Sequence, residues 1–169
     1  MRYEMDWIKR HYIYDSLESN KIGSILYFGI IWASFEDEVC RNVANISQSH
    51  NLSISFVNSA IPAQKAKLTK IWKYFTARYI ESNTTNQIFH DFKFNANDNK
   101  PFVQYALLKQ NRATYEEKAE AIIRIVFRLR NNLLHGQKNI DLLYGQNDNF
   151  KQANILLTML IDMNIRVPL

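Results

Sequence analysis

The strongest indication of the fold is the stretch AEAIIRIVFRLRNNLLHG, which runs from Ala119 to Gly136. On a helix at about 100° per residue, its apolar side chains share one broad face. That face consists of Ile122, Ile125, Val126, Leu129 and Leu133. A glycine after such a pattern commonly ends a helix. The stretch therefore predicts the end of a long core-facing helix over residues 111–135, in which Thr114-x-x-Glu117 resembles a capping box.

Helical spacing of apolar residues recurs in the rest of the chain and predicts an all-α helical bundle. The predicted helices cover residues 3–17, 23–47, 63–82, 102–109 and 150–163, with a break at Ser19-Asn20 and loops at 82–86, 94–100 and 136–148. Residues 48–62 are rich in β-branched and polar side chains, and they fit a loop, a short strand or a small insertion. Because no repeat or linker is visible, residues 1–169 are expected to form a single domain.

The composition narrows the class of protein further. Hydrophobic residues make up 47% of the 169 residues, and only 4 Gly and 3 Pro are present, which disfavours an all-β fold with many tight turns. The single cysteine, Cys40, indicates a reducing compartment and is expected to be a core thiol. The longest apolar run, of about 14 residues, falls short of the roughly 18 that span a bilayer. No secretory signal is visible, so we expect a cytoplasmic protein without a membrane segment.

The charge pattern makes an anionic partner plausible. The net charge is +5, and the predicted helix at 63–82 interleaves cations with aromatic residues. This helix could bind single-stranded RNA by charge and stacking. We favour the alternative, an amphipathic helix with aromatic side chains in the core and lysines in solvent. The histidines His11, His50 and His90 lack carboxylate or cysteine neighbours at ligand spacing, so no metal site is expected. No nucleotide-binding fingerprint occurs, and no cofactor is expected.

The end of the long helix carries residues suited to phosphodiester chemistry. Arg130 can hold phosphate oxygens, and His135 can move a proton near neutral pH. On an unbroken helix the two side chains lie about 140° apart. They can therefore meet at one phosphate only if the helix loosens before Gly136, or if two copies of the chain assemble the site.

Arg130 lies near the apolar edge of its helix, where a charge needs a partner. Glu36 is the candidate, because it lies on the apolar stripe of the helix predicted at 23–47. We favour a structural ion pair between these two residues. The alternative is that Arg130 faces a groove between two subunits. Arg124, Arg128, Asn131 and His135 follow one another at intervals of three or four residues and share the side of the helix opposite the apolar face. Arg124 and Arg128 are therefore candidate RNA contacts.

The Arg130-Asn131-x-x-x-His135 pattern at a helix end, in an all-α chain, resembles the signature of the HEPN family. The resemblance implies a homodimer joined through the motif helices, with one composite cleft. Arg130 and His135 would then carry metal-independent RNA cleavage, and Asn131 would support the site. The implied reaction is attack of a ribose 2′-OH on the adjacent phosphate, with His135 as general acid or base and Arg130 stabilising the developing charge.

Two features depart from the family pattern. One subgroup has a tyrosine two residues after the histidine, where this chain has Gln137, and residues 48–62 have no family counterpart. We expect an endoribonuclease that acts as a toxin or as a stress or phage-defence effector, and a cognate antitoxin protein would follow from that role. The alternatives are a non-catalytic HEPN-like module that binds RNA or a protein, and a purely structural helical dimerisation protein.

Overall fold

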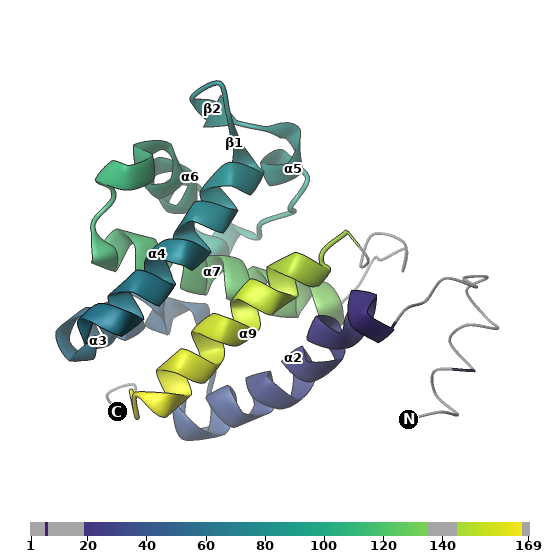
Figure 1. Cartoon of the computed structure of the whole chain (residues 1–169), viewed down its shortest axis with the longest axis vertical. Coiled ribbons are helices and arrows are strands. Elements are labelled where there is room, and N and C mark those ends of the chain that lie inside the picture. The colour runs from purple at the N-terminus through teal and green to yellow at the C-terminus, as the bar shows by residue number, and fades with distance from the viewer. Residues whose placement is uncertain (1–5, 7–18, 135–144, 167–169) are drawn as a thin grey trace.

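The structure, a computed structural model, describes residues 6, 19–134 and 145–166. The predicted helix at 3–17 and most of the predicted loop at 136–148 lie outside these residues. The described chain is mostly helical, which confirms the all-α class (Figure 1). Its α-helices are α2 (Ser19–Glu38), α3 (Ser49–Ser59), α4 (Pro62–Tyr79), α5 (Gln87–His90), α6 (Lys100–Lys109), α7 (Tyr115–Leu134) and α9 (Asn147–Asp162). Three short 3-10 helices among the described residues are labelled η1 (Ile46–Gln48), η2 (Ala96–Asp98) and η3 (Gln110–Arg112).

Helix α7 lies at the centre of the bundle, with α3, α4, α6 and α9 packed against it (Figure 1). Every residue from Lys118 to Leu129 is buried, so the helix is covered on all sides. Helices α2 and α9 run side by side and form a second pair. Phe28 of α2 packs edge-on against Phe150 of α9, with 4.9 Å between the ring centroids. The Asn154 side-chain amide adds a hydrogen bond to the Ser24 carbonyl at 2.8 Å.

Two predicted boundaries of the first long helix are wrong. Helix α2 already includes Ser19 and Asn20, where a break was predicted, and it ends at Glu38 instead of residue 47. The backbone conformation of two residues explains why the helix ends before residue 47. Arg41 and Asn42 adopt φ angles of 52° and 64°, and residues in the left-handed region cannot continue a right-handed helix. The short turn η1 then begins a new element, capped by the Asn45 side chain.

The undecided segment at 48–62 is helix α3 rather than a strand or a loose insertion. Its Ser and Asn residues have modest helix propensity. Leu52 and Phe56, four residues apart, are both buried and turn one face of α3 toward α7. Pro62 then opens α4 at its first turn, where a missing backbone N–H costs nothing.

The remaining predictions concern a loop, a helix cap, the cysteine and membrane-spanning helices. Helix α4 ends at Tyr79 instead of residue 82, and a two-stranded hairpin follows, in which β1 (Ile80–Glu81) pairs with β2 (Thr84–Thr85) of the predicted loop at 82–86. The capping box before α7 is confirmed, because the Glu117 amide donates to Thr114 Oγ1 at 3.1 Å and the Thr114 amide donates to Glu117 Oε2 at 2.8 Å. Cys40 is a buried thiol, and burial raises its pKa to about 12. Among the described helices, none combines the length and apolar character needed to cross a membrane.

Candidate functional site

The arginine of the motif lies in the last turns of α7, where the helix leaves the core. Arg130 is half-buried, and its Nη1 donates to Asn131 Oδ1 at 3.1 Å. Its guanidinium carbon lies 5.5 Å from the centre of the Trp32 ring on α2. Its Nε is buried and has no hydrogen-bond partner within the described part of the chain. Arg130 and Asn131 are therefore brought together, whereas His135 lies outside the described residues.

Glu36 and Arg130 do not contact each other directly, and each of them contacts Trp32. The Trp32 Nε1–H donates to Glu36 Oε2 at 3.3 Å, and no ion pair joins Glu36 to Arg130 over residues 19–134. An aromatic ring is electron-rich on its face and electron-poor at its edge. The cation on the face and the carboxylate at the N–H edge therefore both stabilise the same indole. The predicted ion pair between Glu36 and Arg130 is therefore wrong, and each of the two side chains contacts Trp32 instead.

Arg124 and Arg128 do not lie on an open face, which corrects the helical-wheel expectation for this side of α7. Their exposed fractions are 8% and 5%. Arg124 Nη2 donates to Glu120 Oε1 at 2.7 Å, and Arg128 Nη1 donates to Asp98 Oδ2 at 3.0 Å. The second layer formed by α3, α6 and η2 covers this side of the helix. Both guanidinium groups are thus committed to buried carboxylates.

These ion pairs belong to a polar chain that runs along α7. His50 Nδ1 lies 3.0 Å from Glu120 Oε2 at the start of α3. Toward the motif, Arg128 Nε donates to Asn132 Oδ1 at 3.0 Å, and Asn132 Nδ2 donates to the Phe92 carbonyl at 3.1 Å. Sequence reasoning missed these partners. The i,i+4 spacing of Glu120 and Arg124 was a usable signal, whereas Asp98 lies in a distant turn with no local signal.

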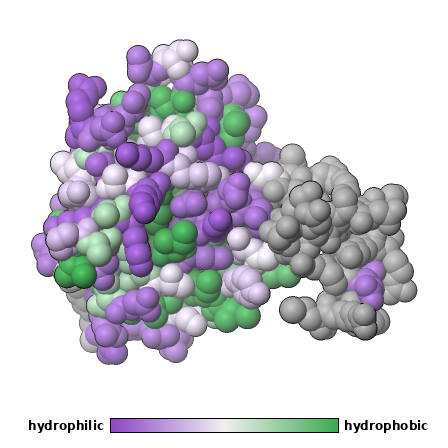
Figure 2. Space-filling model, in the orientation of Figure 1, coloured by the Kyte–Doolittle hydropathy of each residue, from purple (hydrophilic) through white to green (hydrophobic). Residues whose placement is uncertain are grey.

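Helix α4 separates its aromatic residues from its lysines. Trp72, Phe75 and Tyr79 are buried, while Lys67, Lys70 and Lys73 are exposed. This confirms the favoured interpretation of an amphipathic helix. The segment from Val39 to Ile80 contains six Lys or Arg residues and no Asp or Glu, so it accounts for the excess of positive charge in the chain. Figure 2 shows hydrophilic side chains along the course of α4, on the face that Figure 1 presents.

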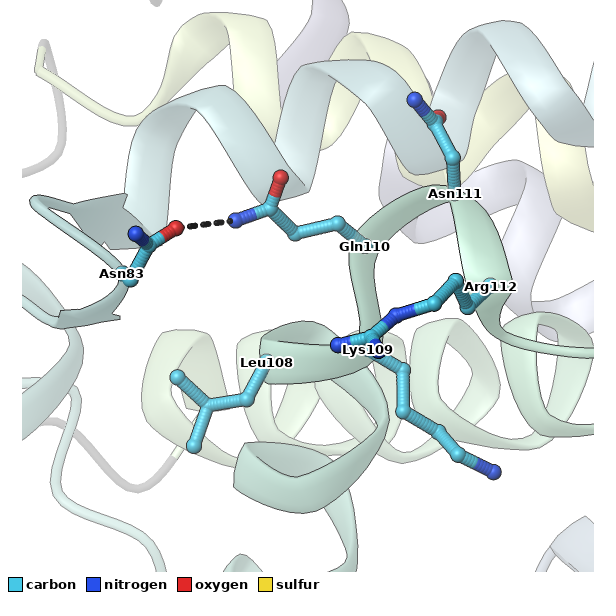
Figure 3. A pocket seen from close by; sticks show the side chains of 6 residues that line it. All are labelled: Asn83, Leu108, Lys109, Gln110, Asn111 and Arg112. Atoms are coloured by element: carbon cyan, nitrogen blue, oxygen red, sulfur yellow. Dashed lines mark hydrogen bonds between the residues drawn. The ribbon is translucent and has the colours of Figure 1, made fainter.

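Hollows indent the described surface. One, of about 420 Å³, lies between the hairpin turn and the end of α6 (Figure 3). Gln110 lines it and donates from its side-chain amide to Asn83 Oδ1 at 3.3 Å, while the backbone of Gln110 has φ 50° and ψ −121°. The carbonyl of this strained residue accepts the Trp72 Nε1–H at 2.9 Å. Another hollow, of about 310 Å³, lies between residues 78–79, 88–92 and 145–149.

The described residues offer acid–base and anion-binding groups. No group of three His, Cys, Asp or Glu side chains within them is placed to hold a metal ion. Comparison with known protein families, with curated proteins and with solved structures finds no match to this chain. The candidate site therefore rests on Arg130 and Asn131 at the end of α7, their support from Trp32, and the chain position of His135 five residues after the arginine.

Proposed function

We propose that this protein is a metal-independent endoribonuclease of HEPN type. The observation that carries the proposal is the state of Arg130. It is half-buried in the last turns of α7, where the helix leaves the core, and it is oriented by Asn131 and Trp32. A guanidinium held in this way is suited to phosphate oxygens, which accept its fixed N–H groups.

In the proposed reaction, a ribose 2′-OH attacks the adjacent phosphate and the 5′-oxygen of the next nucleotide leaves. His135 would transfer the protons, a contribution of roughly 10² to 10⁴ in rate. Arg130 would stabilise the negative charge that develops on the non-bridging oxygens. Asn131 has the arginine as its hydrogen-bond partner, so its part is to orient Arg130. None of these steps requires a metal ion.

Two surface features support an RNA substrate and a second copy of the chain. The exposed lysines of α4 lie in a segment without acidic residues, which attracts a polyanion. We therefore propose Lys67, Lys70 and Lys73 as RNA contacts in place of Arg124 and Arg128. Leu134, the residue before His135, is 59% exposed, and an apolar side chain there suits a homodimer contact beside the motif.

The biological role is proposed from the family resemblance alone. A ribonuclease of this type would act in the cytoplasm as a toxin or as a stress or phage-defence effector. Such a role requires a cognate antitoxin protein that keeps the enzyme inactive until it is needed. Fold and role are separable, so this part of the proposal depends on the activity being found first.

An RNA cleavage assay in the presence of EDTA tests the activity. Wild type is compared with His135→Ala and Arg130→Ala on labelled single-stranded RNA, and the product ends are mapped. Both variants should lose cleavage, and wild-type products should carry a 2′,3′-cyclic phosphate or its 3′-phosphate hydrolysis product. His90→Ala is the matched control, because the hydrogen-bond partner of the His90 ring is Thr85 in the hairpin. No cleavage by folded wild type across varied RNAs would favour the non-catalytic binding module.

A further inference from the structure

The hollow at the hairpin turn is walled by two parts of the chain that are distant in sequence. Asn83 belongs to the turn between β1 and β2, and residues 108–112 form the end of α6 and the turn η3. Figure 3 shows Asn83, Gln110 and Arg112 around this space, on different sides of it. A volume of about 420 Å³ is enough for a small organic ligand.

Gln110 holds a backbone conformation that glycine adopts easily and glutamine adopts only under strain. Its φ is 50° and its ψ is −121°. The Trp72 Nε1–H, at 2.9 Å from the Gln110 carbonyl, fixes this conformation. A glycine here would relieve the strain, so the glutamine side chain lowers the stability of the turn. Strain of this kind is concentrated at functional sites, and here it holds an amide at the wall of the hollow.

The opposite wall is also fixed in place. Ser82 and Asn83 have φ angles of 49° and 61°, the conformation of a two-residue hairpin turn in which asparagine is favoured. Asn83 Oδ1 accepts a hydrogen bond from Gln110 Nε2 at 3.3 Å. That contact leaves the Asn83 side-chain N–H groups free of partners among the described residues. Both walls are thus in position before a ligand arrives, which reduces the entropy lost on binding.

The charge around the hollow is positive. Lys109 and Arg112 are among the lining residues, which include no carboxylate. Lys109 forms an ion pair with Glu117, which does not line the hollow. Arg112 is exposed, and no hydrogen bond or ion pair engages its guanidinium within the described part of the chain. A free guanidinium beside amide donors is suited to an oxyanion.

The placement of the donors favours a terminal phosphate among the oxyanions. A tetrahedral phosphate accepts hydrogen bonds from several directions, whereas the two oxygens of a carboxylate lie in one plane with their carbon. A terminal phosphate has one substituent and can enter between walls, whereas a phosphate inside an RNA strand carries chain on both sides. The hollow is larger than a phosphate group, and Leu108 adds an apolar wall for the rest of a ligand.

We propose that this hollow binds a small phosphate monoester, such as a sugar phosphate or a nucleoside monophosphate. Arg112 holds the phosphate, and the amides of Asn83 and Gln110 donate to its remaining oxygens. The site is separate from the motif, because residues 108–112 precede α7 and Arg130 lies near its end, roughly 22 Å further along the helix axis than Tyr115. The inference does not depend on the proposed function.

The test is a titration of the full chain, labelled with ¹⁵N, at constant ionic strength. The probes are ribose 5-phosphate, AMP, inorganic phosphate and uncharged ribose. Both monoesters should produce saturable shifts of the Asn83, Gln110 and Arg112 amide signals, with a Kd on the order of 1 mM. Inorganic phosphate should bind several-fold more weakly, and ribose should produce no shift. The amides of Ile88 and Gly145, at the other hollow, serve as the internal reference.

Arg112→Gln assigns the binding to the guanidinium. The substitution removes the charge and keeps a polar side chain, and it should weaken monoester affinity roughly tenfold or more. Arg166→Gln is the matched control, because it makes the same change of charge at an exposed residue outside the lining. It should bind as wild type does.

Gln110→Gly separates a binding role from a structural one. The substitution relieves the backbone strain and removes the side-chain amide, so the melting temperature should stay the same or rise while affinity falls roughly threefold to tenfold. Asn164→Gly, at another exposed residue with φ 50°, is the control and should leave affinity unchanged. Thermal unfolding of every variant checks that the fold is kept.

Several results overturn the proposal. They are the absence of saturable shifts with either monoester at about 10 mM, equal shifts with ribose, and wild-type affinity in both Arg112→Gln and Gln110→Gly. Equal affinity for inorganic phosphate overturns the choice of a monoester. A short RNA without a terminal phosphate that shifts the same amides more strongly than AMP overturns it as well, and makes Arg112 a contact for the RNA backbone. RNA cleavage is measured separately, so a failure of the ribonuclease leaves this result unchanged.

Discussion

Arg128 and Asp98 form a buried ion pair at 3.0 Å between the central helix α7 and the turn η2, thirty residues earlier in the chain. Asp98 Oδ2 also accepts the backbone amide of Asn95 at 2.6 Å. The carboxylate therefore holds its own turn in shape while it neutralises a guanidinium in the core. Removing one partner of such a pair leaves the other charge buried and alone.

Asp98→Asn should accordingly lower the free energy of unfolding by roughly 3–5 kcal/mol. The amide still fills the space and can still accept from Asn95, so the loss reports the unpaired charge on Arg128. Urea unfolding at pH 7 gives the measurement. Asp162→Asn, an exposed carboxylate at the end of α9, should stay within about 0.5 kcal/mol of wild type. A change below about 1 kcal/mol in Asp98→Asn would mean that water reaches the pair.

Trp32→Phe tests whether the indole positions Arg130. Phenylalanine keeps an aromatic face but binds a cation more weakly and cannot donate to Glu36. We expect RNA cleavage to slow roughly threefold to tenfold, mainly in kcat. Tyr27→Phe, an exposed change on the same helix, is the control and should leave the rate unchanged. An equal rate in Trp32→Phe, with Arg130 still required, would show that Asn131 alone orients the guanidinium.

The lysines of α4 predict a measurable salt dependence. Each phosphate contact on a single strand contributes about 0.7 to the slope of log affinity against log salt. Replacing Lys67, Lys70 and Lys73 with glutamine should weaken RNA binding and flatten that slope by up to about 2. The control neutralises three other exposed cations, Lys93, Lys151 and Arg166, and makes the same change in net charge. Identical slopes in both triple variants would assign the effect to net charge instead of the α4 surface.

Glu117 predicts a contribution to stability that is lost in acid. Its burial raises the carboxyl pKa, but hydrogen bonds from Lys109 and from the Thr114 amide outweigh burial and hold that pKa below the ordinary value of 4.5. A lowered folded-state pKa stabilises the protein above the unfolded-state pKa, and the stability is lost as pH falls through the folded-state value.

The stability difference between wild type and Glu117→Gln should therefore be largest near pH 7 and shrink as pH falls below about 4.5. Urea unfolding across this range measures it. Glu81→Gln, an exposed substitution in the hairpin, should show little difference at any pH. A difference in Glu117→Gln that stays constant with pH would show that the charge of Glu117 is not what stabilises the start of α7.

The spacing of residues along the chain predicted the features that depend on contacts between residues close in sequence. The capping box before α7 needs only Thr114 and Glu117 three residues apart, and it forms as predicted. The aromatic residues of α4 fell on the buried face for the same reason. Helix α3 was not predicted, because its Leu52 and Phe56 become informative only when α7 is there to cover them.

The environment of the arginines could not be predicted from one helix. A helical wheel assigns a polar side to solvent, but α7 is central and both of its sides are covered. Arg124 and Arg128 therefore required buried carboxylates, one of which comes from the distant residue Asp98. The predicted ion pair of Arg130 with Glu36 does not form, because each of the two side chains contacts the indole of Trp32 instead.

The cation–π contact between Arg130 and Trp32 also limits which segments of this protein can be transferred to another protein. The motif lies near the C-terminal end of the chain, but the surface that orients its arginine comes from a helix about a hundred residues earlier. The α7 segment alone is consequently not a portable unit. A chimera that transplants the motif onto another scaffold must supply an indole and a carboxylate at the equivalent place, or its arginine will keep only the hydrogen bond to Asn131.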